Sequence, residues 1–389
     1  MTSFAGIFVP TALRDAVSDE AWLSAMLDAE RALANAESLV GAIPAAAAAA
    51  IAERCEPERY DLAAIEEQGR AVGNPAEPLV RALREQVGGD DARYVHFGAT
   101  SQDVVDTAAM LVARAAVELV AAELDGVAAA CARLAEEHRE TPMAGRTLLQ
   151  QAVPTTFGAK AAGWLVAVVE ACEGLRSLRF PAQLGGAAGT LAPLGERGVD
   201  VVAAFAAELD LEEPTVPWHT HRGPVAAIGS ALDASASACA KLALDVILLA
   251  QTEIGEVVEA EGGGSSTMPH KRNPAKAVLA RACARLVHAN ARVLTSGEHE
   301  HERAAGAWQA EWTALSEALA QAGGAASAAR ECVERLELRP ERMRANMSGD
   351  LYAEREAFVE RGLADASDDW LGSAGAFVDR ALARWRESA

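Results

Sequence analysis

The segment GGGSSTMPHKRNP occupies residues 262–274 and leads directly into AKAVLARACARLVHANARVL at residues 275–294. Three consecutive glycines permit backbone angles that other residues avoid, so the sequence predicts a mobile loop here. The alanine-rich run favours a helix, and Asn273 before Pro274 fits an N-cap followed by the first helical position. The basic cluster of residues 270–272 should then lie at the positive end of that helix, which is an anion-binding site in outline.

Helix-favouring runs dominate the chain on both sides of this segment. Besides the run that follows it, the long ones cover residues 104–137, 156–178, 225–258 and 303–336. These runs greatly exceed the average globular helix of about 11 to 12 residues. Strand signals are limited to short pieces near residues 147–153 and 180–184. The sequence therefore predicts an all-α fold built on a bundle of long helices.

Glycine and proline clusters divide this predicted fold into three parts. Residues 1–97 should form an N-terminal helical domain, and residues 98–338 the central long-helix bundle. Residues 339–389 should form a short C-terminal domain. The chain contains no internal repeat that would indicate a solenoid.

The composition excludes several classes of function. Hydrophobic residues make up 51% of the 389 residues and charged residues 23%, which is usual for a folded globular protein. The formal net charge of -21 argues against nucleic acids and anionic membrane surfaces as partners, because both attract basic proteins. The start of the chain lacks the features of a secretory leader, and no apolar run is long enough to cross a bilayer. We therefore expect a cytoplasmic protein.

The cysteines and histidines give no indication of a metal centre. The six cysteines lie far apart without paired spacing, so we expect reduced, buried thiols rather than disulfides or zinc ligands. His219 and His221, like His299 and His301, are two residues apart, and this spacing points side chains to different faces of a helix. The sequence predicts neither a bound metal nor a cofactor.

Two further polar loops precede helix-favouring runs. Residues 96–106 read HFGATSQDVVD, in which Asp103 follows Thr100 at the spacing of a capping box. Residues 145–158 read GRTLLQQAVPTTFG and again place hydroxyl groups and a proline at a helix start. Each loop alone is explained by helix capping. Together with the basic loop at 262–274 they suggest one shared anion pocket, and both interpretations stay open at this point.

The same three segments carry a resemblance to the fumarase/aspartase superfamily. GSSTMPHKRNP looks like its signature, and GATSQDVVDTA and GRTLLQQAVPTTFG occur where the superfamily has its other two active-site regions. Within it, VHFGATSQDVVDTA, LGGAAGTLAPLG and EHERAAGAWQAEWTAL look most like the 3-carboxy-cis,cis-muconate cycloisomerase branch. The resemblance implies a long-helix bundle and a cofactor-free homotetramer whose active sites are shared between subunits. It also implies that the C-terminal domain is truncated here.

The resemblance further implies roles for individual residues. Ser265 would be the base that exchanges a proton at carbon, with its alkoxide stabilised by Lys271. Lys271 and Asn273 would hold the substrate carboxylate whose charge grows in the transition state. The other predicted substrate-binding residues are Thr100, Ser101 and Gln102, which would hold a second carboxylate from another subunit, and His96, Thr147, Gln151, Arg222, Ser266 and Met268. A purely structural histidine is an equally open interpretation of His96.

One departure from the superfamily pattern restricts the chemistry. Fumarase-like and adenylosuccinate-lyase-like members carry a histidine and a partner glutamate where this chain has Leu148 and Val278. Such a pair protonates a poor leaving group, and general acid catalysis of this kind contributes about 10²- to 10⁴-fold. A leaving group that is already a stable anion needs no proton. The double replacement therefore favours an anionic leaving group, such as the carboxylate released when a lactone ring opens.

The sequence thus predicts an enzyme that acts on a small polycarboxylate. The favoured reaction is cycloisomerisation of 3-carboxy-cis,cis-muconate to carboxymuconolactone in aromatic catabolism, the β-ketoadipate pathway. The first alternative is a lyase that releases fumarate by β-elimination from a succinyl compound with a good anionic leaving group. The second is a non-catalytic helical scaffold, as crystallin relatives of the superfamily are.

Overall fold

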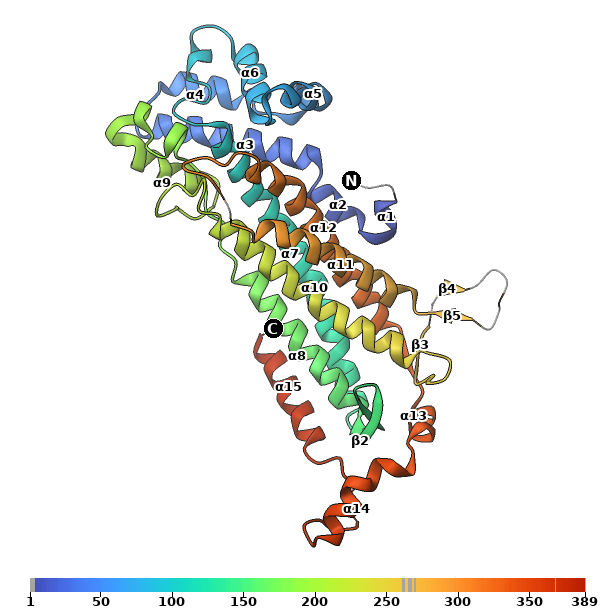
Figure 1. The fold of residues 1–389 in the computed structure, drawn as a ribbon. Helices are drawn as coiled ribbons and strands as arrows, with labels where there is room; N and C mark the ends of the chain where they lie inside the picture. Colours follow the sequence, from blue (N-terminus) through green and yellow to red (C-terminus); the bar gives the residue numbers. More distant parts are fainter. Residues whose placement is uncertain are drawn as a thin grey trace.

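The computed structural model describes residues 4–260, 263–264, 268, 271–297, 299–367 and 369–388. Helices account for most of these residues, which confirms the predicted all-α class. Figure 1 shows an elongated molecule whose long helices run side by side, with shorter helices gathered at both ends. No helix in the described part of the chain combines the length and apolar character needed to cross a bilayer.

The body of the molecule is a bundle of long helices (Figure 1). Its members are α7 (Ser101–Glu137), α8 (Phe157–Arg176), α10 (Gly223–Leu249), α11 (Ala275–Leu294) and α12 (Ala307–Glu334). The helix α7 has 37 residues and therefore extends about 55 Å along the bundle. Alanines make up much of the buried surface of α7 and α12, and such small side chains let helix axes approach closely.

Two glycines in α12 admit the N-terminal helices α1 (Ala5–Phe8) and α2 (Thr11–Ala16) against the bundle. A Cβ atom at Gly323 would overlap the side chain of Leu13, and one at Gly324 would lie 2.5 Å from the carbonyl oxygen of Phe8. Because α12 has no side chain at these two positions, the N-terminal segment packs directly on its backbone.

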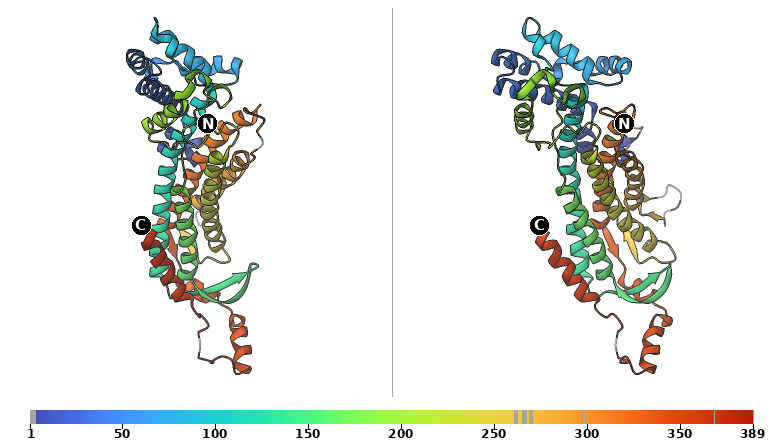
Figure 2. Two further views of the ribbon diagram at one scale, coloured as in Figure 1. Left: turned by 90° about the vertical axis from the view of Figure 1, so that its left-hand side faces the viewer. Right: turned by 60° about the vertical axis from the view of Figure 1, so that its left-hand side comes forward.

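The N-terminal end of the molecule is a layer of helices, all of them short except α3, seen at the top of both views in Figure 2. In order they are α3 (Asp19–Leu39), α4 (Ala45–Ala52), η1 (Pro57–Arg59), α5 (Leu62–Val72), α6 (Ala76–Val87) and η2 (Asp91–Tyr94). The helix α9 (Gly198–Glu208) packs on α3, and the short turns η3 (Gly186–Ala188) and η4 (Ala192–Arg197) lead into it. This layer covers the end of the bundle at which α7 begins.

The C-terminal part consists of α13 (Pro340–Asn346), η5 (Gly349–Tyr352), α14 (Ala353–Glu360) and α15 (Ala374–Ser388). The helix α15 lies against α8, where Arg384 pairs with Glu173. A second ion pair, Arg139 with Asp379, ties α15 to the segment after α7. The predicted domain borders at 97/98 and 338/339 stay predictions.

Strands in the described residues form three two-stranded antiparallel sheets. They are β1 (Pro142–Thr147) with β2 (Gln150–Thr156), β3 (Val257–Glu259) with β6 (Leu336–Leu338), and β4 (Gly263–Gly264) with β5 (Arg272–Asn273). The predicted strand near residues 147–153 lies in the β1–β2 hairpin. The one predicted near 180–184 is wrong, because only an isolated bridge joins Pro181 to Glu212.

Two predicted helix boundaries are also wrong. The run at 225–258 ends as a helix at Leu249, since residues 257–259 pair with 336–338 in a sheet. Asn273 is not the N-cap of α11: it lies in β5, and Pro274 occupies the cap position. In both places the local sequence favours a helix, but pairing with a distant segment makes the residues part of a strand or loop instead.

Candidate active site

The basic loop begins and ends at a short ladder beside the bundle. Gly263 pairs with Asn273 and Gly264 with Arg272, so the two ends of the connecting segment lie side by side. Lys271 is exposed, its backbone N–H donates to the carbonyl oxygen of Met268, and the side chain of Met268 is 40% exposed. The predicted base Ser265 and its neighbour Ser266, like His270 of the basic cluster, lie outside the described residues.

The positive end of α11 already binds a carboxylate of the protein itself. Glu259, on β3, accepts hydrogen bonds from the backbone N–H groups of Lys276 at 2.9 Å and Ala277 at 3.3 Å. Its side chain is buried, with 3% of the residue exposed. The expectation that these N–H groups bind a ligand is therefore corrected: Glu259 occupies them. No local sequence signal indicates this pairing, since Glu259 lies 17 and 18 residues from its two partners.

The N-terminus of α7 has the predicted capping box, with Thr100 as N-cap and Asp103 reaching back to it. Asp103 also does more than cap the helix. Its carboxylate accepts the backbone N–H groups of Gly185 and Gly186 at 2.9 Å each and lies 2.6 Å from Nε2 of His219. One buried carboxylate thus joins three segments that are far apart in the sequence.

The predicted substrate-binding residues at this terminus differ in what they can offer a ligand. Thr100 and Ser101 are half-buried, and the hydroxyl oxygen of Thr100 accepts the backbone N–H of Asp103 in the capping box. Gln102 is fully buried: its amide nitrogen donates to Asp106 at 3.1 Å and to the carbonyl oxygen of His219 at 2.8 Å. Its oxygen accepts from Arg303. Only the two hydroxyl residues therefore remain available for direct contact with a substrate.

Arg222 is the centre of a buried ionic network. Its guanidinium donates to both oxygens of Asp106, at 2.7 and 2.8 Å, and to Glu311 at 2.6 Å. Burial disfavours the charged form, but the two carboxylates outweigh it, so the pKa of Arg222 is raised above its usual value. The ring of Trp218 lies 4.7 Å below the guanidinium. The carboxylates that Arg222 pairs with belong to the protein, which argues against direct contact with substrate.

His96 is held by a buried carboxylate from α3. Its Nδ1 lies 2.5 Å from Oε1 of Glu30, which is 1% exposed. Burial lowers the pKa of His96, but the charge of Glu30 and its hydrogen bond outweigh this effect and raise the pKa above the usual value. The backbone of His96 is left-handed, with φ of 61°. The pairing gives His96 a structural partner and leaves a direct substrate contact as a prediction.

The β1–β2 hairpin carries the second predicted region. Thr147 is exposed, and Gln151 is fixed by donating to the carbonyl oxygen of Asn346 at 2.8 Å. Leu148 and Leu149 form the turn, with φ of 52° and 65°, and are 97% and 75% exposed. Leucines rarely adopt this left-handed geometry, and apolar side chains rarely stand so free of the surface.

The three predicted regions do not meet within one chain. The residues Thr100 and Ser101 start α7, whereas the β1–β2 hairpin follows its far end, about 55 Å away along a helix of this length. Figures 1 and 2 show the hairpin at the opposite end of the bundle from the N-terminal layer, with β4–β5 on a third side. Arg222 and His96 do lie near the start of α7, through their contacts with its first turns or with the loop before it.

Several residues that shape this site were not predicted from the sequence as site residues. Asp106, Glu311, Arg303 and His219 hold the α7 terminus through contacts between distant segments. The signal that was available is compositional: Glu311 and Asp106 are carboxylates at helical positions that otherwise face the core. Among the described residues no group of three or more His, Cys, Asp or Glu could hold a metal ion. All six cysteines are free and buried, as predicted.

Comparison with known proteins shows which family the chain resembles. A family model described as lyase matches residues 10–288. The chain is 48% identical to a nitrosuccinate lyase of Streptomyces davaonensis, over 90% of this chain and 78% of that one. It is 44% identical to a 3-carboxy-cis,cis-muconate cycloisomerase of Bradyrhizobium diazoefficiens, over 90% of this chain and 80% of that one.

Solved structures agree with these matches. The 3-carboxy-cis,cis-muconate lactonizing enzyme from Pseudomonas putida superposes with a TM-score of 0.89 and 34% identity over 99% of both chains. A fumarate lyase from Mesorhizobium sp. BNC1 gives a TM-score of 0.83 and 33% identity over 97% of this chain and 98% of that one. These matches to enzymes argue against the alternative of a non-catalytic helical scaffold. The chain belongs to the lyase family of the fumarase/aspartase superfamily and is an enzyme of that superfamily.

Proposed function

We propose that this enzyme interconverts 3-carboxy-cis,cis-muconate and carboxymuconolactone in aromatic catabolism. The observation that carries the proposal is similarity along nearly the whole chain to several cycloisomerases, at 44%, 45% and 42% identity, together with the fold of the Pseudomonas putida enzyme. An apolar Leu148 where other members carry an acid supports a reaction whose leaving group is already an anion.

The proposed reaction closes a lactone ring. One substrate carboxylate forms a C–O bond to a carbon of the diene, the π bond breaks, and Ser265 delivers a proton to the neighbouring carbon. In the reverse direction Ser265 removes that proton and the ring carboxylate leaves. Lys271 and Asn273 hold the carboxylate that gains charge in between, with Ser266 and Met268 beside them. Thr100, Ser101 and Thr147 complete the site from other copies of the chain.

A homotetramer in the cytoplasm is part of this proposal. The separation of the α7 terminus from the hairpin supports a site built from several copies, because a substrate of this size cannot span one long helix. Apolar side chains left exposed on α11 support association through that face, namely Val278, Leu286 and Val293 at 52%, 46% and 37% exposure. Leu148 and Leu149 offer a second such surface.

A second candidate is elimination of a stable anion from a succinyl compound, with fumarate as the other product. The 48% identity to a nitrosuccinate lyase favours it specifically. Nitrite, like a carboxylate, is stable as an anion and leaves without a proton, so Leu148 suits this reaction as well as lactone opening. Both candidates use the same base and the same carboxylate-binding groups.

Parallel assays of purified enzyme separate the two candidates. Incubation with 3-carboxy-cis,cis-muconate should remove the absorbance of the conjugated diene. Incubation with nitrosuccinate should release no fumarate. The opposite pattern would replace the first candidate by the second. Ser265→Ala should lower turnover by about 10²- to 10⁴-fold, as for loss of a proton-transfer group. Full activity of that variant would overturn the choice of base.

A further inference from the structure

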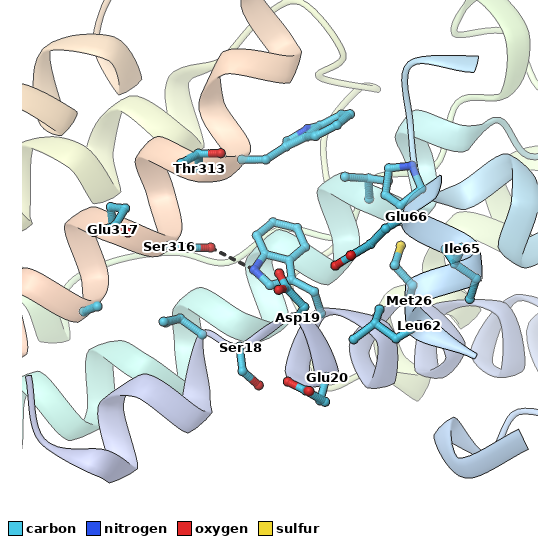
Figure 3. A pocket seen from close by; sticks show the side chains of 16 residues that line it. Ser18, Asp19, Glu20, Met26, Leu62, Ile65, Glu66, Thr313, Ser316 and Glu317 are labelled. Atoms are coloured by element: carbon cyan, nitrogen blue, oxygen red, sulfur yellow. Dashed lines mark hydrogen bonds between the residues drawn. The ribbon is translucent and has the colours of Figure 1, made fainter. Parts of the chain in front are cut away.

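A pocket of about 360 Å³ opens between α3, α5, α12 and the early turns of α7 (Figure 3). None of the predicted active-site residues lines it. Its volume lies within the range of small-molecule sites, which start near 300 Å³. The pocket is therefore a separate feature of the fold, and its lining indicates what it can bind.

The charges around the pocket all have one sign. Asp19, Glu20, Glu66 and Glu317 line it, and no lysine, arginine or histidine does. Within the part of the chain that the structure describes, none of these carboxylates forms an ion pair. Asp19 and Glu20 lie in the first turn of α3, where acidic residues are common. Glu66 in mid-α5 is also exposed, whereas Glu317 in α12 is half-buried at the edge of the pocket.

The wall beneath these carboxylates is aromatic and aliphatic. The indole of Trp22 is fixed by donating to Oγ of Ser316 at 2.9 Å, and Met26 and Ile65 beside it are buried. In Figure 3 the carboxylates of Asp19 and Glu66 point toward the space next to this indole, from two different helices. Both carboxylates are also exposed to solvent, so water weakens their mutual repulsion, and a cation placed between them would be attracted by both.

We propose that this pocket binds a small organic ammonium ion. The carboxylates supply the opposite charge, the indole face attracts a cation, and the hydrocarbon wall accommodates its alkyl groups. A metal ion fits less well, because no group of three or more candidate ligands occurs among the described residues and hard cations require several oxygen ligands. The acidic chain as a whole, with a net charge of -21, adds to the attraction.

Choline and 3,3-dimethylbutan-1-ol provide a matched pair of probes, because they have the same shape and differ in charge. Titration calorimetry on the full-length protein should give saturable binding of choline at one site per chain. The neutral alcohol should bind at least tenfold more weakly. Intrinsic tryptophan fluorescence should change with the same midpoint, since Trp22 and Trp312 line the pocket, and raising the salt concentration should weaken choline binding.

The variants Glu66→Gln and Glu67→Gln test whether choline binds in this pocket. Glu67 is the next residue on α5, is exposed and does not line the pocket. We expect Glu66→Gln to weaken choline binding severalfold and Glu67→Gln to leave it unchanged, with equal melting temperatures. The proposal is wrong if choline does not bind, if the neutral alcohol binds as tightly, or if both variants weaken binding equally. Turnover of the proposed substrates is read separately, so this result does not depend on the proposed function.

Discussion

Arg222 is a single positive charge that neutralises two buried carboxylates. Asp106 and Glu311 are 1% and 4% exposed, and Trp308 also donates to Asp106 at 2.9 Å. Through Asp106 the network reaches Gln102, next to the hydroxyls of Thr100 and Ser101. Arg222 therefore acts on the site by positioning the α7 terminus. Removing its charge would leave Asp106 without a counter-ion in a region that excludes water, and would leave Glu311 with only Nε2 of His299, at 3.2 Å.

Arg222→Met should lower the free energy of unfolding by about 3–5 kcal/mol, as for other buried ion pairs that lose one partner. Urea denaturation at neutral pH measures the effect. The matched control is Arg133→Met, at an exposed pair with Glu137, where the loss should stay below about 1 kcal/mol. Equal losses in the two variants would contradict the importance of the network.

Glu37 is a buried carboxyl group whose side chain has no described hydrogen-bond partner. Its residue is 0% exposed and neither carboxylate oxygen accepts a hydrogen bond. Burial, and then the charge of Glu30, raise its pKa from 4.5 to about 9. The folded protein therefore keeps a proton on Glu37 over a pH range in which the unfolded chain has lost it.

The resulting pH dependence has a definite sign. Between pH 4.5 and about 9 this group should lower the unfolding free energy by about 1.4 kcal/mol for each pH unit gained. Glu37→Gln removes this contribution, so the variant should exceed the wild type in stability at pH 8 and match it near pH 4. Urea titrations at several pH values test this, with exposed Glu53→Gln as the control. Parallel pH profiles of variant and wild type would show that Glu37 is ionised in the fold.

Among the secondary-structure elements, the β1–β2 hairpin is under the most evident strain. Its two-residue turn requires positive φ at both positions, for which Asn-Gly is the favoured sequence, yet Leu148 and Leu149 occupy it. Arg146 anchors the hairpin to buried Glu256 at 2.6 Å. A strained turn that exposes two leucines is explained if the leucines are buried by another copy of the chain.

Replacing both leucines, Leu148→Asn with Leu149→Gly, should relieve the turn and yet weaken assembly. Light scattering should detect smaller oligomers, and turnover should fall at least tenfold because the hairpin no longer completes a neighbouring site. The control is Val72→Asn, which also removes an exposed apolar side chain, at 48% exposure, but lies on α5. An intact oligomer with full activity would show that the leucines have no partner.

The elongated shape of the whole molecule separates its polar loops. Because α7 extends about 55 Å, the groups at its start and those after its end belong to different sites unless copies assemble side by side. Each completed site would then combine Thr100 of one chain with Thr147 of another, and the superfamily resemblance implies that Ser265 comes from a different copy than Thr100. A defect in either region would leave the other region of the same chain intact.

Co-expression of two inactive variants tests this arrangement. Ser265→Ala and Thr100→Val should each be nearly inactive alone, whereas mixed oligomers should contain some sites with neither substitution. Turnover of the mixture should therefore exceed the sum of the two parent activities. No recovery, with mixed oligomers confirmed by mass spectrometry, would mean that both residues serve the same site within one chain.

The helical class, the long bundle, the Thr100–Asp103 capping box and the free cysteines could all be predicted from the amino-acid sequence. These depend on local signals, since helix periodicity and caps are set by residues within a few positions of one another. The resemblance of three short segments likewise identified the superfamily and the candidate base, because those motifs are contiguous.

Which polar side chains already have a partner became known from the packing of the folded chain. Nothing within a few residues of Arg222, Gln102 or Glu259 reveals that Glu311, Arg303 or the α11 terminus will satisfy them. Pairing with distant segments also ended α10 at Leu249 and moved Asn273 into a strand. The physical reason is common to all of these cases: a buried polar group must find a partner, and the partner is chosen by how the helices pack rather than by its neighbours in the chain.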